Sequence, residues 1–175
     1  MTQPSFDLYR PDREPSREQL IDELAAIPAR RRELVEAIDM EAFKRPLVAD
    51  EWAPIEICRH IRDAVQVYGM RFKWMILEDD SFLPNYDEDR WVAGSPDGPA
   101  ELPAILQQVA AYRSETIRLL RSLSSAGWSR RGRHEISGWV ELEPYVGHEL
   151  AHEEQHLLQL RRAAGDPDGE CVASV

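Results

Sequence analysis

The sequence lacks the features that mark several large classes of protein. It has two cysteines among 175 residues, which is too few for the disulfide framework of a small secreted domain. It has no apolar run long enough to cross a bilayer, because charged side chains and histidine interrupt its most apolar stretch. Residues 1–15 contain acidic side chains and no apolar centre, so they do not resemble a secretory signal. We therefore expect a cytoplasmic protein with no membrane partner.

Positive charge is also in short supply. Lys and Arg together number 21, whereas Asp and Glu number 32, so the formal net charge is -11 at pH 7. An acidic surface repels phosphate backbones, and no stripe of Lys and Arg offsets it. The sequence therefore predicts no nucleic-acid partner.

Four segments carry apolar residues at the three- and four-residue spacing of amphipathic helices. They cover residues 16–38, about 54–77, about 99–122 and about 141–164. The first begins with Ser16 and Gln19 at capping-box spacing, and Pro28 is expected to kink it or split it in two. Pro54 stands where the first turn of the second helix tolerates proline.

Four such segments, without convincing strand alternation, predict an all-α domain in the form of a four-helix bundle with long connections. The connections over residues 79–98 and 124–139 are long enough to allow crossovers, so a simple up-and-down order does not follow. We expect an extended N-terminal arm over 1–15, the bundle over 16–165 and a loose C-terminal tail over 166–175.

Three of the five histidines fall in the fourth helical segment, at positions 148, 152 and 156. Residues four apart on a helix lie on the same face, so His152 and His156 can share a metal ion. His148 and His156 are about 12 Å apart along the axis, which is too far for one ion. A third ligand must come from another helix, and His60 lies in the inward stripe of the second segment.

Other interpretations of these histidines stay open at this point. An inward-facing histidine is usually a hydrogen-bonded core residue, and one His-x-x-x-His pair is a weak signal. The segment HELAHEEQH could also form a solvated face that includes Glu149, Glu153 and Glu154. Glu149, three residues before His152, is a candidate fourth ligand that would close the site.

Several sequence features together resemble the DinB-like superfamily of four-helix metalloproteins. They are Trp52-Ala53-Pro54 at a helix start, EICRHIRDA around His60, RRGRHEISGWVELEPYV, and HEEQHLLQLRR near the C-terminus. The resemblance covers about residues 20–162. It implies that His60, His152 and His156 form a metal-binding triad, with Glu153 where the family often has Asp, and with His148 and His134 outside the triad.

The resemblance also implies a function, because the family includes thiol-dependent S-transferases and a mycothiol-dependent isomerase. We expect a divalent transition metal, with zinc or nickel first, a low-molecular-weight thiol, and a small-molecule substrate. Three imidazole ligands leave coordination positions open for thiol or water, so thiol transfer and metal-dependent hydrolysis are both expected reactions. A non-catalytic, stress-associated bundle that binds a metal or small ligand is the alternative.

Side chains around the triad are harder to assign from sequence. Four arginines, at positions 59, 62, 71 and 113, are candidates to hold an anionic thiol, although pairing with the many acids is the stronger expectation. Cys58 points about 200° away from His60 around the helix and is interpreted as a small core residue. One or two of the five tryptophans are expected to line a pocket. A homodimer is expected by analogy with other bundles of this size, with no motif behind it.

Overall fold

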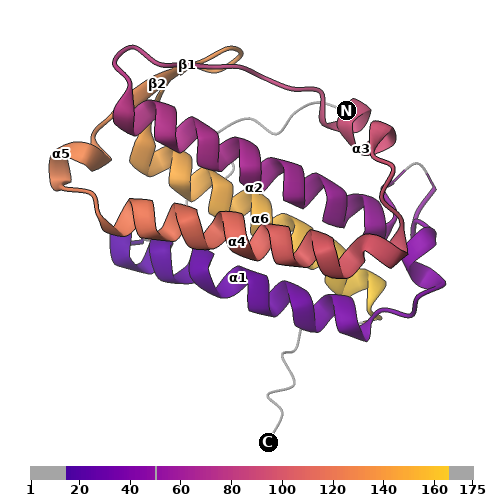
Figure 1. Ribbon diagram of the computed structural model, residues 1–175. Coiled ribbons are helices and arrows are strands. Elements are labelled where there is room, and N and C mark those ends of the chain that lie inside the picture. Colours follow the sequence, from indigo (N-terminus) through magenta and orange to yellow (C-terminus); the bar gives the residue numbers. More distant parts are fainter. Residues whose placement is uncertain (1–14, 50, 166–175) are drawn as a thin grey trace, which may run out of the picture.

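The computed structural model describes residues 15–49 and 51–165, which form an all-α bundle (Figure 1). The long helices are α1 (Arg17–Ala37), α2 (Pro54–Leu77), α4 (Leu102–Arg121) and α6 (Leu142–Ala163). The predicted fold class is therefore confirmed. Apart from Pro15, the arm predicted over 1–15 lies outside the described residues, and so does the tail predicted over 166–175.

The first long helix begins and continues for local reasons. Ser16 Oγ accepts a hydrogen bond from the Gln19 amide at 3.2 Å, while Gln19 Oε1 accepts one from the Ser16 amide at 2.8 Å, which completes the predicted capping box. The expectation that Pro28 splits the helix is wrong, since α1 runs through it to Ala37. Apolar side chains are buried on both sides of Pro28, so packing against the bundle supports the helix through the proline.

The long connections are more regular than the sequence predicts. The segments between the long helices contain the short helices α3 (Glu88–Gly94) and α5 (Ser125–Trp128), the 3-10 helices η2 (Ala42–Lys44) and η3 (Pro99–Glu101), and the strands β1 (Phe82–Leu83), β2 (Arg131–His134) and β3 (Gly138–Glu141). The strand order is β1-β2-β3, with β1 parallel and β3 antiparallel to β2. Strands of two to four residues are too short to leave an alternating pattern in the sequence.

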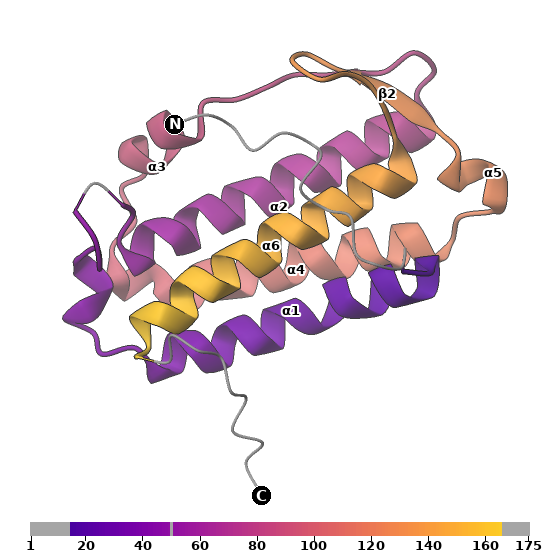
Figure 2. The ribbon, with the colours of Figure 1, turned by 180° about the vertical axis from the view of Figure 1, so that it is seen from behind.

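Among the long helices, α2 packs against α4, the next one along the chain, whereas α1 and α2 lie apart. α1 packs against α4 and α6, and α2 packs against the same two helices, so α1 and α2 lie on opposite corners of the bundle (Figure 2). The connection from α1 to α2 therefore crosses the bundle, and the order is not a simple up-and-down one. α2 and α6 run antiparallel, because His60 near the start of α2 meets His152 late in α6, whereas Arg71 meets Tyr145 at the opposite end.

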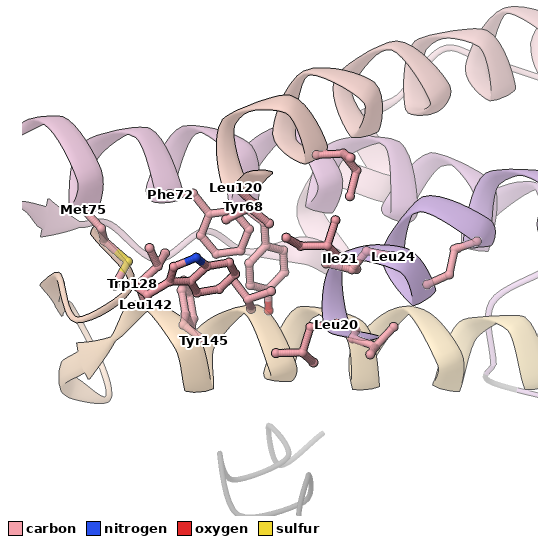
Figure 3. Close-up of a cluster of buried hydrophobic side chains, with 14 of the residues drawn as sticks. Leu20, Ile21, Leu24, Tyr68, Phe72, Met75, Leu120, Trp128, Leu142 and Tyr145 are labelled. Carbon is pink, nitrogen blue, oxygen red and sulfur yellow. The ribbon is translucent and has the colours of Figure 1, made fainter. Parts of the chain in front are cut away.

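A large apolar cluster fills the end of the bundle beneath the small sheet (Figure 3). Its aromatic members include Tyr68, Phe72, Trp128 and Tyr145. This packing anchors α2 and α6 side by side and so sets the register at which their polar residues meet. Within residues 15–49 and 51–165, no helix has the length and apolarity needed to span a bilayer.

Candidate metal centre

Three histidine side chains converge between α2 and α6. His60 comes from the second turn of α2, and His152 and His156 lie one turn apart on α6. The Nε2 atom of His152 is 3.0 Å from that of His60 and 3.2 Å from that of His156. The structure thus brings together the three residues that the sequence singled out, each with a ring nitrogen within 4.8 Å of the others.

The spacing of these nitrogens fits a metal ion. Two imidazole nitrogens that each lie 2.0–2.1 Å from a tetrahedral ion are about 3.3 Å apart. The two Nε2 separations of 3.0 and 3.2 Å are close to that value. Neutral imidazoles also cannot all donate to one another, so a shared cation is the natural partner for three facing ring nitrogens.

Neighbouring side chains hold the rings in this orientation. Gln159 Oε1 lies 2.7 Å from Nδ1 of His156, so a proton on Nδ1 leaves Nε2 of that ring free as a ligand. Trp52, just before α2, packs its ring 4.7 Å from the His60 ring and 6.2 Å from the His156 ring. Glu88 of α3 places Oε2 4.0 Å from Nδ1 of His60, which is near but beyond hydrogen-bonding distance.

Burial keeps the three imidazoles neutral. It lowers the pKa of His60 to about 3, with the neighbouring His156 adding to the effect, and lowers the pKa of His156 to about 4. Burial also lowers the pKa of His152 well below its usual value, with His156 and His60 contributing next. Neutral imidazole is the form that binds a metal, so the site is ready to accept an ion at neutral pH.

The remaining histidines lie away from this centre. His148 stacks parallel to the Tyr145 ring at 6.1 Å and lies 6.2 Å from the Tyr68 ring. His134, in β2, accepts hydrogen bonds on Nδ1 from the amides of Ile136 and Ser137, both at 3.3 Å. Neither belongs to the converging group.

The glutamates of α6 correct two of the sequence interpretations. Glu149 and Glu153 are each 1% exposed, so the solvated face proposed for them is wrong. Glu149 is also wrong as a fourth ligand, because its Oε1 lies 2.8 Å from Nη2 of Arg113 and outside the histidine group. Only Glu154 lies at the surface, where it pairs with Arg30.

The four candidate arginines occupy different environments. Arg113 is buried and pairs with Glu149 and Glu153, and Arg62 pairs with Asp63 and Asp97. Arg59 is partly buried and close enough to Asp97 to lower the pKa of that carboxyl, although the hydrogen bond from Arg62 lowers it most. Arg71 is the exception, as it is buried and, within the part of the chain that the structure describes, donates only to neutral oxygen atoms.

Cys58 behaves as the sequence predicted. It is 1% exposed and packs in an apolar cluster with Ile57 and Ile61, away from the histidines. Burial raises the pKa of its thiol to about 12, although Arg31 acts in the opposite direction. Cys171 lies outside the described residues.

Sequence reasoning missed three members of the site. Gln159 had a usable signal, since it lies three residues after His156 on the same helix. Trp52 stood out only as part of the helix-start motif Trp52-Ala53-Pro54, which does not place its ring beside the histidines. Glu88 had no signal, because it belongs to a short helix that the sequence treats as loop and that reaches His60 only through tertiary packing.

Comparison with known proteins places this geometry in a family. A sequence profile of the DinB superfamily matches residues 23–160. The chain is 22% identical over 140 residues to a "Putative metal-dependent hydrolase" of Bacillus mycoides (strain KBAB4), covering 80% of both chains. It is 22% identical over 155 residues, 89% of both chains, to a protein of that description from Bacillus cereus (strain AH820).

Among solved structures, the fold resembles that of YfiT from Bacillus subtilis. YfiT is described as "a probable metal-dependent hydrolase with an unusual four-helix bundle topology", and the match has a TM-score of 0.79 at 24% identity. It covers 90% of this chain and 94% of that chain. The likeness shows that the two chains share a fold over nearly their full lengths.

Proposed function

Since the chain belongs to the DinB superfamily, we propose that His60, His152 and His156 hold one divalent transition ion in a metal-dependent enzyme. The convergence of the three Nε2 atoms is the observation that carries this proposal. Imidazole ligands suit zinc and nickel, which are the ions we expect first. The family relatives named as metal-dependent hydrolases support the same assignment.

The ligand set favours catalysis over a purely structural role. Structural zinc sites are closed by four protein ligands, whereas catalytic sites keep a position open. Glu149, the one candidate to close the site from α6, is held by Arg113 instead. A bound divalent ion lowers the pKa of the water or thiol that it holds and so supplies a nucleophile near neutral pH.

The residues of the chain then have distinct tasks around the ion. Gln159 favours a proton on Nδ1 of His156, which keeps Nε2 of that ring available as a ligand, and Glu88 places a carboxylate near Nδ1 of His60. Trp52 packs against both rings and excludes water from that side of the site. These contacts position the ligands before an ion arrives, which limits the reorganisation that binding requires.

Hydrolysis of a small substrate is the first reaction that we propose. In it a water molecule attacks an electrophilic carbon, the bond to the leaving group breaks, and the leaving group takes up a proton. The resemblance to thiol-dependent enzymes supports a second candidate, in which the thiolate of a low-molecular-weight thiol attacks the electrophile. Both reactions use the same open position, and the alternative of a binding protein without turnover requires that neither occurs.

Elemental analysis followed by turnover assays tests the proposal. Purified protein should retain about one zinc or nickel ion per chain after dialysis. The reloaded protein should then either hydrolyse ester and amide substrates or consume thiol together with an electrophile. His156→Ala should lose both the metal and the turnover, while His148→Ala, on the same helix, serves as the matched control for metal retention. A metal-loaded protein that does neither reaction would support the binding protein, and a metal-free protein would contradict the site itself.

A further inference from the structure

Arg71 is a buried cation with unused hydrogen-bond donors. Its side chain is 4% exposed. Its Nη1 donates to the Tyr145 hydroxyl at 2.8 Å, and its Nη2 donates to the Pro84 carbonyl. A guanidinium has five N–H groups, so these two bonds leave three donors over. Among the described residues, Nε of Arg71 is buried and has no acceptor.

The charge of Arg71 is also uncompensated, in contrast to the other buried arginines. Arg31 and Arg113 share the carboxylate of Glu153. Within residues 15–49 and 51–165, however, no carboxylate oxygen lies within 4.0 Å of a guanidinium nitrogen of Arg71, which is the limit for an ion pair. Burying a charge without a counter-ion is costly, so a buried guanidinium in this state is suited to receive an anion from outside.

The groups around Arg71 form a polar and aromatic wall that reaches the surface. Its Cζ lies 5.9 Å from the Tyr68 ring and 6.0 Å from the Tyr86 ring. Burial lowers the pKa of both His134 and His148, and the charge of Arg71 is the next largest cause. Tyr86 and His148 are only partly buried, so this wall includes residues that solvent reaches.

Arg71 lies within reach of a small molecule held at the metal centre. The Tyr68 ring links the two places, since it lies 5.9 Å from the His152 ring and 5.9 Å from Cζ of Arg71. The guanidinium is therefore at most about 12 Å from a proposed ligand. The chain after β1 runs back along α2 to α3 and covers this interval (Figure 1), with Pro84 bonded to Arg71 and Glu88 beside His60.

We propose that Arg71 binds the carboxylate of a small anionic substrate whose opposite end reacts at the histidine centre. A carboxylate fits because its two oxygens can accept from Nε and the adjacent Nη in one plane. This inference rests on the proposed function and adds the substrate class to it. Arg71 is then the residue that selects the substrate by charge.

A purely structural role for Arg71 is the competing explanation. In that case the residue only joins α2 and α6 to the segment at Pro84, through the two bonds already made. Two such structural hydrogen bonds would contribute to stability but would not distinguish an acid from an alcohol of the same length. Discrimination between two such ligands is therefore the measurement that separates the roles.

Matched thiol probes make this measurement on the unmodified chain. The acidic probes are 3-mercaptopropionate, 6-mercaptohexanoate and 8-mercaptooctanoate. Each is paired with the mercapto alcohol of the same chain length. Thiolate binding to cobalt-loaded protein is followed by its charge-transfer absorption. One length of acid should bind roughly tenfold or more tightly than its alcohol, because a charge-assisted hydrogen bond is worth about that much. Arg71→Gln should remove this preference and Arg71→Lys should keep part of it.

Arg62→Gln is the matched control, because Arg62 lies on the same helix but is already paired with Asp63 and Asp97. It should leave the preference intact. Equal binding of acids and alcohols at every length would overturn the inference, and so would a preference that survives Arg71→Gln. If the protein takes up no cobalt, the proposed metal centre fails separately. Calorimetric titration of the metal-free protein with the same acids and alcohols then tests Arg71 by itself. Tighter binding of an acid than of its alcohol, lost in Arg71→Gln, supports the carboxylate site, and equal binding overturns it.

Discussion

Glu153 of α6 lies 2.7 Å from Nη2 of Arg113 of α4, and neither side chain is more than 2% exposed. The same carboxylate also bonds Arg31 of α1. The two guanidiniums lower the pKa of Glu153, although burial alone would raise it. Three of the four long helices are thus joined by one buried carboxylate, which follows directly after the proposed ligand His152.

Removing this carboxylate should destabilise the protein strongly. Glu153→Ala leaves the buried Arg31 without its carboxylate and removes one of the two carboxylates that pair with Arg113, which costs about 3–5 kcal/mol of unfolding free energy. The neighbouring Glu154→Ala breaks a partly exposed pair with Arg30, which joins α6 to α1. It should cost at most about 1 kcal/mol. Urea unfolding of metal-free protein compares the two, and equal losses would mean that the buried network adds nothing beyond a surface pair.

The positions of the histidines on α6 predict a clear order of metal affinity. His60→Ala, His152→Ala and His156→Ala should each lose the ion, because two imidazoles hold it weakly. His148→Ala and His134→Ala should keep it, since both rings lie outside the converging group. Metal titrations in one buffer test the order. Weaker binding by His148→Ala than by His156→Ala would show that the assigned triad is wrong.

His134 should make the protein less stable in mild acid. Burial, with Arg71 next, lowers its pKa from 6.5 to about 4. Above about pH 7 the residue is neutral in both states, so it has no effect there. As the pH falls from 6.5 towards 4, the unfolded chain takes up a proton that the folded state does not, and stability falls by up to about 1.4 kcal/mol per pH unit.

His134→Asn provides the matched comparison for this pH effect. The asparagine carbonyl can accept from the same two amides that bond His134 Nδ1, but it does not titrate. The difference in unfolding free energy between the two proteins should therefore change between pH 7 and pH 4.5, in favour of the variant at low pH. A constant difference would show that His134 takes up its proton equally in both states.

Cys58 should be inert in the folded protein. Its thiol is buried, and the pKa of about 12 leaves almost no thiolate at pH 8. In a Cys171→Ser variant, where Cys58 is the remaining cysteine, an aromatic disulfide reagent should react at the rate of unfolding. Full reaction in denaturant provides the control, and rapid reaction without denaturant would contradict the burial of this residue.

The sequence by itself determined the helices and the metal-ligand candidates. Local signals placed α1 and α2, through the capping box at Ser16 and the proline at position 54. Residues His152 and His156 share a face because a helix repeats every 3.6 residues, which no tertiary contact is needed to establish. Two helices that run antiparallel then bring His60 level with that pair, which the sequence could only assume.

Only the tertiary structure decided the partners of the buried charges. Glu149 and Glu153 have the same helical pattern as a solvated face, and their burial depends on which arginines α1 and α4 bring to them. Glu88 reaches His60, and Arg71 reaches Pro84, across segments whose position depends on the fold of a connection. Helical periodicity is a property of neighbours along the chain, whereas compensation of a buried charge depends on residues far apart in sequence, so the first could be predicted and the second could not.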